Sequence, residues 1–321
     1  MTEKLYDVTA LGEILIDFTE WGFSDDGARL FAQNPGGAVA NVAAAVARLG
    51  GRAAFVGKVG ADMHGTFLRQ TLQEAGVDVS GVATDAERFT TLAFVKLAEN
   101  GERSFSFARY DAADTNLRWE EVPRTLLTDT RVLSVGTLGM TDEPMRTTQL
   151  RCIETAKAAG AYIAVDPNYR ATLWRSEGDF LRQTERLLEL ADYVKLSDEE
   201  TALVTGCTDP EKALEALERR GVRTAVVTRD KDGAMALSGG QLVRAAGVPA
   251  VAVDATGAGD AFWGGFLYKV STAEKHLDEL TQEDLKEFAR FGNAVASLCV
   301  EKKGAIPAMP ELAQVERRIA K

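Results

Sequence analysis

The chain has 321 residues, 45% of them hydrophobic and 26% charged, and a formal net charge of −11. This composition is typical of a globular protein of one or two domains, and its acidic excess, without any Lys/Arg run, argues against nucleic-acid binding because phosphate backbones are negative. Three cysteines without a Cys-x-x-Cys pair exclude a disulfide scaffold, and the lack of a signal pattern or bilayer-length apolar run favours a cytoplasmic protein with no membrane contact.

Short β-rich runs alternate with amphipathic helical stretches along the chain. The strand-like runs are YDVTALGEILIDF (6–18), AAFVGKVG (53–60), RVLSVGT (131–137), AYIAVDPN (161–168), DYVKLS (192–197) and RTAVVTR (223–229). The helical stretches are 38–49, 65–75, 145–159, 180–190 and 211–220. Nearly continuous apolar strands are expected where helices cover both faces of a parallel sheet. We therefore predict a doubly wound α/β domain whose ligands bind beyond the carboxyl ends of the strands.

One region interrupts this alternation. In FTTLAFVKLAENGERSFSFARY (89–110), two strand-like runs flank Asn100-Gly101, a strong signal for a tight hairpin turn. No helix separates the two runs. The hairpin is either an edge of the main sheet or part of a small sheet that covers the ligand site as a lid.

A glycine turn precedes the first helical stretch. In NPGGAVANVAAAVARLG (34–50), Gly36 and Gly37 stand directly before strongly helical residues. Paired glycines let the backbone approach a ligand closely. Asn41 follows one turn into the helix, although asparagine favours caps and turns. Its amide either makes a local hydrogen bond or grips hydroxyl groups of a ligand, because it both donates and accepts.

A second glycine turn lies between two carboxylates in DATGAGD (254–260) and opens the apolar helical run AFWGGFLYKV. Gly257, Ala258 and Gly259 would expose backbone N–H groups at a helix N-terminus, where the helix dipole favours an anion. Asp260 falls in the first turn of that helix. It is either a helix-stabilising residue or a carboxylate that accepts a proton.

Familiar nucleotide motifs do not fit this turn, since a dinucleotide fingerprint would require glycine at Phe262 and a P-loop would require Gly-Lys-Ser/Thr. The chain instead resembles the ribokinase/PfkB sugar-kinase family over nearly its whole length. The first family signature is seen in GGAVANVAAAVARLGGRAAFVGKVGAD (36–62), followed by HGTFL. The second is DATGAGDAFWGGF (254–266), and both stand in the family's order at an appropriate separation.

The resemblance implies a single ribokinase-like α/β kinase domain over residues 1–321, with a mostly parallel sheet flanked by helices. Discontinuous segments at about 12–34 and 88–118 would form a small β-sheet lid. The implied activity is ATP-dependent phosphorylation of a sugar or nucleoside hydroxyl with Mg²⁺, and many relatives also use K⁺. Phosphoryl transfer of this kind depends on positioning and on stabilising the charge of the moving group.

The resemblance also assigns roles to the two glycine turns. By similarity, Asp260 is the catalytic base that takes the proton of the substrate hydroxyl. The residues of the anion hole for the transferred phosphoryl group are Gly257, Ala258 and Gly259. The residues that match the family's sugar-binding positions are Asp17, Gly36, Gly37 and Asn41. A carboxylate and an amide suit a polyol because each binds two hydroxyl groups.

The nucleotide side is implied by two further segments. KLSDEETALVTG (195–206) resembles the family's Asn-x-x-Glu segment: Glu200 matches the glutamate that organises Mg²⁺ indirectly, and Ser197 stands where the family has Asn. VVTRDKDGA (226–234) resembles the nucleotide-binding turn, with Asp230 where the family usually has Gly. The expected nucleotide-binding residues are Lys195, Thr228, Gly233, Gly257, Gly259 and Asn293. Asp254 and VEKKGAIP (300–307) resemble the loops that bind a monovalent cation, commonly K⁺.

The segments FARYDAADTNL (107–117), VDPNYR (165–170) and VKLSDEE (194–200) resemble the fructokinase branch. We therefore expect conversion of D-fructose and ATP to fructose 6-phosphate and ADP. Arg109 and Arg170 would contact sugar or phosphate, or else be surface or ion-pairing arginines. A 2-keto-3-deoxygluconate kinase, another sugar kinase of the family and a non-catalytic sugar or nucleotide sensor stay open. Lid-to-lid dimers occur among relatives, so we expect a homodimer through the lid.

Overall fold

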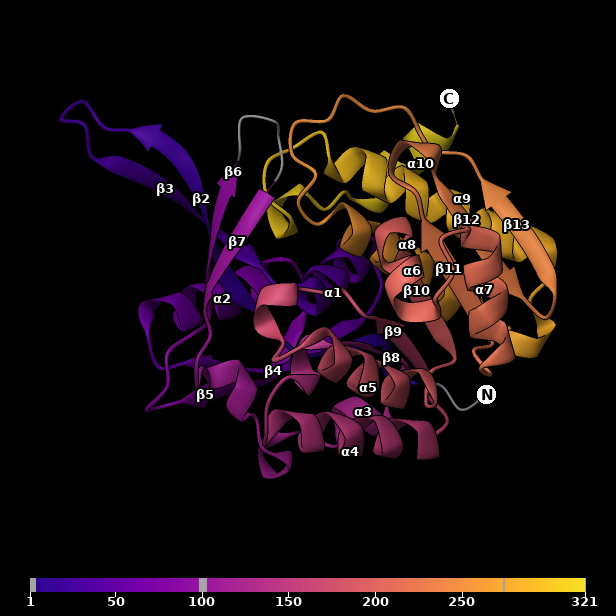
Figure 1. Ribbon diagram of the computed structural model, residues 1–321, viewed down its shortest axis with the longest axis horizontal. Helices are drawn as coiled ribbons and strands as arrows, with labels where there is room; N and C mark the ends of the chain where they lie inside the picture. Colours follow the sequence, from indigo (N-terminus) through magenta and orange to yellow (C-terminus); the bar gives the residue numbers. More distant parts are fainter. Residues whose placement is uncertain (1–3, 98–102, 274, 321) are drawn as a thin grey trace.

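The computed structural model describes residues 4–97, 103–273 and 275–320. Its main element is a nine-stranded sheet in the order β13-β12-β11-β10-β9-β8-β1-β4-β5 (Figure 1). The strands of this sheet are β1 (Tyr6–Leu11), β4 (Ala53–Gly60), β5 (Asp78–Asp85), β8 (Thr130–Gly136), β9 (Tyr162–Asp166), β10 (Tyr193–Ser197), β11 (Thr224–Thr228), β12 (Ala234–Ser238) and β13 (Gln241–Ala245). The strands from β5 to β11 are parallel, and β12 and β13 continue the sheet antiparallel. The predicted fold class is confirmed.

Helices cover both faces of the main sheet. The α-helices are α1 (Ala38–Arg48), α2 (Met63–Glu74), α3 (Thr125–Thr128), α4 (Met145–Ala158), α5 (Glu177–Leu188), α6 (Asp198–Thr205), α7 (Pro210–Arg219), α8 (Ala258–Thr272), α9 (Gln282–Cys299) and α10 (Leu312–Ile319). One buried core joins the sheet to α1, α2, α8, α9 and α10, and the other joins it to α3–α7. Successive strand residues point to opposite cores: Val132 packs in the first core and Leu133 in the second. This two-sided burial explains why the strands are apolar nearly throughout.

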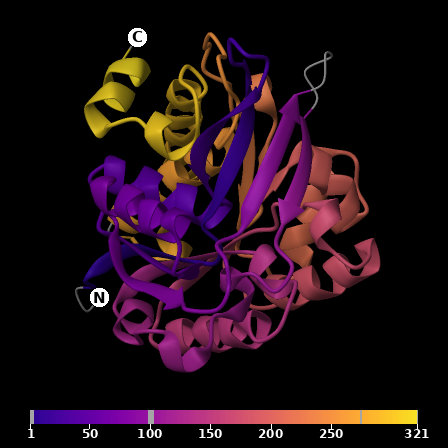
Figure 2. The ribbon, with the colours of Figure 1, turned by 90° about the vertical axis from the view of Figure 1, so that its left-hand side faces the viewer.

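A separate four-stranded sheet stands beside the main body (Figures 1 and 2). Its order is β3-β2-β6-β7, from β2 (Leu15–Phe23), β3 (Arg29–Gly36), β6 (Leu92–Leu97) and β7 (Arg103–Ala108). We call it the small sheet. The predicted hairpin is the antiparallel pair β6–β7, which therefore belongs to the small sheet and is not an edge of the main one. The turn expected at Asn100-Gly101 lies outside the described residues.

The first strand-like run is divided between the two sheets, which corrects the prediction of one strand over 6–18. β1 ends at Leu11 in the main sheet, and β2 begins at Leu15 in the small sheet. Gly12 separates them with φ at 152°, and a Cβ at this position would lie 2.8 Å from Cγ2 of Val39. Glycine is therefore required where the chain leaves one sheet for the other.

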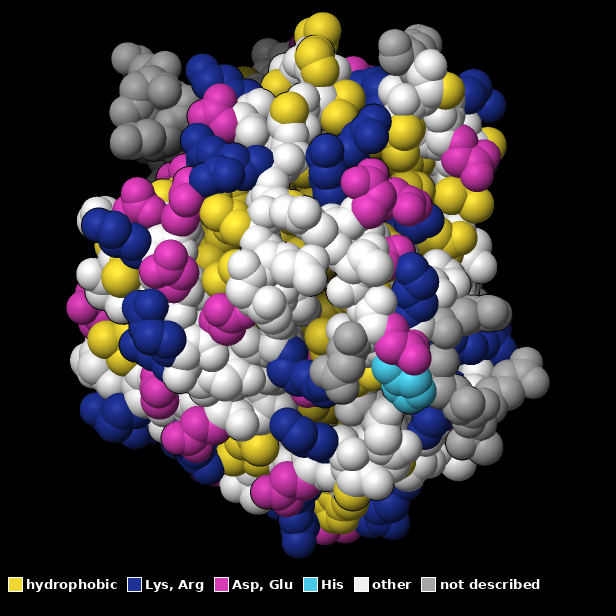
Figure 3. All heavy atoms as spheres, turned by 90° about the vertical axis from the view of Figure 1, so that its right-hand side faces the viewer, with side chains coloured by type: hydrophobic (Ala, Val, Ile, Leu, Met, Phe, Trp, Pro, Cys, Tyr) yellow, Lys and Arg dark blue, Asp and Glu magenta, His cyan; other side chains and the backbone are white. Residues whose placement is uncertain are grey.

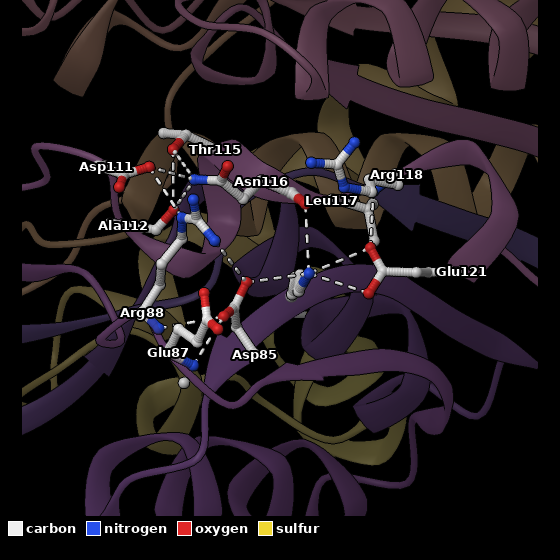
Figure 4. A network of polar contacts seen from close by, with 12 residues as sticks. Asp85, Glu87, Arg88, Asp111, Ala112, Thr115, Asn116, Leu117, Arg118 and Glu121 are labelled. Carbon is white, nitrogen blue, oxygen red and sulfur yellow. Dashed lines mark hydrogen bonds and ion pairs between the residues drawn. The ribbon is translucent and has the colours of Figure 1, made fainter.

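Charged networks hold the base of the β6–β7 hairpin against the main body (Figure 4). Nζ of Lys58 in β4 lies 3.0 Å from Oδ2 of Asp85 and 2.9 Å from Oε1 of Glu121. Nε of Arg88, before the hairpin, donates to Oδ1 of Asp111, after it, at 2.8 Å. These contacts tie both roots of the hairpin to the β4–β5 edge of the main sheet.

The surface carries both signs of charge. On the face turned toward the viewer in Figure 3, Lys/Arg and Asp/Glu side chains are interspersed and do not form a patch of one sign. Across the described part of the chain, the helices are all too short or too polar to cross a membrane.

Candidate active site

A cleft of about 650 Å³ opens at the carboxyl ends of β9, β10 and β11. The small sheet and the N-termini of α1 and α8 form its other walls. The predicted site residues that line it are Asp17, Gly37, Asn41, Arg170, Lys195, Glu200, Thr228, Gly257, Ala258, Gly259 and Asp260. The parallel sheet thus places its ligand site where such sheets ordinarily do.

The second glycine turn forms the N-terminus of α8. Gly257 is the residue before the helix and has a left-handed φ of 76°. A Cβ on Gly257 would lie 2.5 Å from Cβ of Ala305, so only glycine fits the turn as it stands. Gly257, Ala258 and Gly259 line the cleft at this helix start, and the helix dipole favours an anion beside it.

Asp260 lies in the first turn of α8 and meets the first turns of α1. Its Oδ2 atom accepts a hydrogen bond of 2.7 Å from Nδ2 of Asn41. Burial raises the pKa of Asp260 above its ordinary value, although Lys195, the Asn41 hydrogen bond and Arg170 act in the opposite direction. The result is a half-buried carboxyl group whose affinity for a proton is increased.

Lys195 and Asp166 form a buried ion pair at the base of the cleft. Nζ of Lys195 lies 2.5 Å from Oδ2 of Asp166, and each side chain is only 6% exposed. Burial raises the pKa of Asp166 to about 6, against the lowering effect of Lys195. Burial lowers the pKa of Lys195, but the charges of Asp166, Glu200 and Asp260 outweigh it and leave the pKa raised. The ammonium is therefore held in its charged form.

Glu200 joins the start of α6 to the loop after β9. Its Oε2 accepts from the backbone N–H of Ser197 at 2.9 Å, and the Ser197 hydroxyl in turn accepts from the Glu200 N–H. Its Oε1 accepts from the N–H of Tyr169 at 2.7 Å. Ser197, which replaces the family's Asn, therefore completes a capping box around this glutamate.

Comparison with known proteins identifies the family of this chain. The family model "pfkB family carbohydrate kinase" matches residues 7–312. The chain belongs to the PfkB family of carbohydrate kinases. The kinase is accordingly a sugar phosphotransferase, and the suspected family resemblance is confirmed.

Its relatives include proteins named as fructokinases. The kinase is 38% identical over 314 residues to "Probable fructokinase-7" of Arabidopsis thaliana, covering 96% of this chain and 91% of the relative. The crystal structure of a fructokinase from Xylella fastidiosa with bound ATP has a TM-score of 0.91 and 34% identity, covering 98% and 99% of the two chains. A double mutant of a Vibrio cholerae fructokinase, in a fructose-, ADP- and potassium-bound form, has a TM-score of 0.88 and 32% identity, covering 99% of each chain.

Two buried acidic residues of the kinase's cleft were missed by sequence reasoning, Asp166 and Glu13. Asp166 ends β9, so its position at the carboxyl end of a predicted strand was an available signal. Glu13 is 2% exposed, its Oε1 accepts from the N–H of Ala38 at 2.7 Å, and its Oε2 is buried without a partner among the described residues. Burial raises the pKa of Glu13 to about 7. No sequence pattern predicted this contact, which depends on the chain turning at Gly12.

Arg109 lies outside the cleft of the kinase. Of the two roles considered for it, substrate contact and ion pairing, the structure shows an ion pair. It is 7% exposed and lines a neighbouring cavity. Its Nε donates to Oδ2 of Asp114 at 2.8 Å, Nη1 donates to the Thr141 hydroxyl, and Nη2 donates to the carbonyl oxygen of Leu138. Arg109 thus joins the end of β7 to the loop after β8.

Gly233 and Asn293, which were predicted to bind the nucleotide, both contact the turn that follows β13. A Cβ on Gly233 would lie 2.2 Å from the carbonyl oxygen of Ala245, and φ at Gly233 is 91°. Nδ2 of Asn293 donates to the carbonyl oxygens of Ala245 and Ala246 at 3.0 Å. Neither residue lines the cleft; both shape the 245–247 turn instead.

Gly36 and Asp254 also lie behind the cleft surface. A Cβ on Gly36 would come within 2.1 Å of Oδ2 of Asp17, so glycine makes room for that carboxylate. Asp254 accepts hydrogen bonds of 2.9 Å from the N–H groups of Thr256 and Gly304. It thereby joins the turn before α8 to the loop at 300–307.

Proposed function

We propose that the kinase transfers the γ-phosphoryl group of ATP to the 6-hydroxyl of D-fructose. The observation that carries this proposal is the placement of the Asp260 carboxyl, with its raised pKa, at the N-terminus of α8 in the same cleft as Asp17 and Asn41. The fructokinase relatives support fructose as the acceptor. The products are fructose 6-phosphate and ADP.

Asp260 is the base of the proposed reaction. It takes the proton of the sugar hydroxyl while the hydroxyl oxygen forms a bond to the γ-phosphorus and the bond from that phosphorus to the bridging oxygen of ADP breaks. A raised pKa brings a carboxylate closer to the operating pH, which suits a general base. The N–H groups of Gly257, Ala258 and Gly259 stabilise the charge on the moving phosphoryl group.

The sugar lies between the small sheet and α1 in this proposal. Asp17 on β2 and Asn41 on α1 line the cleft from these two sides, with Gly37 between them. Their oxygen and amide groups offer acceptors and donors to several hydroxyls at once. Because the small sheet contributes Asp17, we infer that it covers the bound sugar as a lid and excludes water.

The nucleotide lies over the ends of β10 and β11, beside Lys195 and Thr228. Among the described residues, no group of three or more His, Cys, Asp or Glu side chains is placed to hold a metal ion directly. Glu200 nevertheless lines the cleft and offers the hard oxygen atoms that Mg²⁺ prefers. It would help to hold hydrated Mg²⁺ on the ATP phosphates, where the ion neutralises charge.

A monovalent cation site is proposed beside Asp254. This carboxylate accepts hydrogen bonds from the N–H groups of Thr256 and Gly304, so it joins the 254–256 turn to the 300–304 loop. The Vibrio cholerae relative is in a potassium-bound form. K⁺ at this place would stabilise the turn that begins α8.

The small sheet also offers a surface for a homodimer. Trp21, Phe23, Leu30 and Phe31 are exposed on β2 and β3. Exposed apolar side chains gathered on one sheet are typical of an interface. We propose that two copies associate through this surface, and sedimentation of the wild type beside a Phe23→Ser/Phe31→Ser variant tests it by the loss of a dimer.

The test of the proposed function is an ADP-release assay with ATP and Mg²⁺, run with and without K⁺. Fructose, 2-keto-3-deoxygluconate and ribose are compared as acceptors. We expect kcat/KM for fructose to exceed the others by about tenfold or more, equivalent to about 1.4 kcal/mol. Preference for ketodeoxygluconate would overturn the assignment in favour of that kinase, and no turnover with any sugar would favour a sensor.

A further inference from the structure

The kinase contains two buried Lys–Asp pairs, and they differ in how completely each is bonded. Lys58 pairs with Asp85 at 3.0 Å, with both side chains 7% exposed, and its ammonium also bonds Glu121 and the carbonyl oxygen of Asn116. Figure 4 shows the network around this pair, which lies outside the cleft. A buried ammonium needs such a set of acceptors because it carries three N–H donors and has lost its water.

The second pair, Lys195 with Asp166, lacks that set. The Lys195 ammonium makes one hydrogen bond among the described residues, to Oδ2 of Asp166. The other carboxylate oxygen, Oδ1, is buried and accepts no hydrogen bond from the described residues. Both side chains nevertheless line the cleft. A pair that costs desolvation energy and is left incompletely bonded is poorly explained by stability alone.

The position of the ammonium supplies a second observation. A Cβ built on Gly259 would lie 3.5 Å from Nζ of Lys195 and 3.8 Å from its Cε. Lys195 therefore lies against the first turn of α8, beside backbone N–H groups that favour an anion. The absence of a side chain at Gly259 leaves the ammonium and the helix start facing one space.

We propose that Asp166 is a positioning residue for phosphoryl transfer, which holds the Lys195 ammonium against the Gly257–Gly259 turn so that both meet the transferred phosphoryl group. The lysine stem is flexible, and an isolated ammonium in this buried place would turn toward Glu200 or Asp260. Asp166 holds the ammonium in place instead. It ends β9, which pairs in parallel with β10, the strand that carries Lys195. The inference rests on the proposed function, because it concerns that same reaction.

The experiment compares Asp166→Asn with Asp85→Asn, the matched change in the pair outside the cleft. Asp166→Asn keeps the shape but removes the charge that holds Lys195. We expect kcat/KM for ATP to fall about 100-fold or more, with KM for fructose changed less than about threefold. Asp85→Asn is expected to lower the melting temperature and to change kcat/KM for ATP less than about threefold; because Asp85 anchors the hairpin of the small sheet, any kinetic effect falls on KM for fructose. Equal behaviour of the two variants would overturn the proposal.

A double-mutant cycle separates positioning through Lys195 from a general structural effect. If Asp166 acts through the ammonium, Asp166→Asn in a Lys195→Met background changes kcat/KM for ATP by less than about threefold. Additive losses would contradict the mechanism. Asp166→Glu is a second variant in case Asp166→Asn does not fold, since it keeps the charge and displaces Nζ of Lys195. Wild-type activity in a folded Asp166→Glu protein would contradict the positioning role.

Two readouts distinguish failure of this inference from failure of the proposed function. Wild-type turnover with the acceptor sugars is measured first and reports on the function alone. The affinity for ADP, measured by calorimetry without turnover, then reports on Lys195. We expect Asp166→Asn to weaken ADP binding less than about fivefold while a vanadate–ADP complex, which resembles the transferred group, loses about tenfold or more. Equal losses would assign Asp166 to nucleotide binding only and overturn the inference.

Discussion

Nδ2 of Asn41 donates a 2.7 Å hydrogen bond to Oδ2 of Asp260, so the first turns of α1 and α8 meet at the proposed base. The two helices approach closely because Gly264 of α8 faces α1: a Cβ there would lie 2.5 Å from Cβ of Ala45. The small residues of α8 and α1 therefore allow the two helices to pack closely. They bring the amide and the carboxylate within bonding distance.

Replacing Asp260 tests its role as the base. Asp260→Asn is nearly isosteric and removes the proton acceptor, so we expect kcat to fall by about 10³-fold while fructose binding is kept. Steady-state kinetics and calorimetric titration with fructose check both parts. Turnover within about tenfold of wild type in a folded variant would remove Asp260 from the proposed role.

The Asn41 contact predicts a change in the pH dependence of the reaction. The hydrogen bond from Asn41 lowers the pKa of Asp260, against burial, which raises it. Asn41→Asp replaces this donor by a like charge and must raise that pKa further. Since the base acts when deprotonated, the acidic limb of kcat moves to higher pH. Asn41→Ala, which only removes the bond, should move it in the same direction by less; an unmoved limb in both would disprove the coupling.

Glu13 predicts a pH-dependent stability. An unfolded glutamate releases its proton near pH 4.5, whereas burial raises the pKa of folded Glu13 to about 7. Between these values the folded state binds more protons, so the free energy of unfolding falls as pH rises, by about 3 kcal/mol in all. Glu13→Gln removes this loss.

The measurement is urea unfolding of wild type and Glu13→Gln at pH values from 5 to about 8. The stability of the variant relative to wild type should rise with pH across this window. Glu215→Gln, on the exposed side of α7, is the control for loss of a surface carboxylate. A constant difference between Glu13→Gln and wild type would show that Glu13 does not titrate as stated.

Replacing Arg109 distinguishes a stabilising role of this residue from a role in binding the sugar. Arg109→Met leaves Asp114 buried without its partner, and we expect a loss of about 3–5 kcal/mol in the free energy of unfolding. KM for fructose should change little. Arg29→Met breaks a pair whose arginine side chain is 54% exposed and should cost less than about 1 kcal/mol. A large rise in KM without loss of stability would instead return Arg109 to the sugar site.

The fold could be predicted because its strands are buried on both faces and its helices are amphipathic, and both properties are local. Asn41 and Asp260 were found because each follows a glycine turn at a helix start. Glu13 and Asp166 were missed because their roles arise from contacts with Ala38 and Lys195, which are distant in sequence. The role of Arg109 could not be decided, since its partners are Asp114 and two residues of the loop after β8, which is distant in sequence.

The parallel pairing of β2 with β6 has a consequence for folding. Ile16 lies opposite Leu92, and the chain between them forms β3, α1, β4, α2 and β5. Closing so long a loop costs entropy, which the β1–β4–β5 part of the main sheet must first compensate. We therefore expect the small sheet to assemble late on the folding pathway. The small sheet could therefore not be excised or grafted as a module. Its β2–β3 and β6–β7 halves pair in register only while the main sheet holds them together.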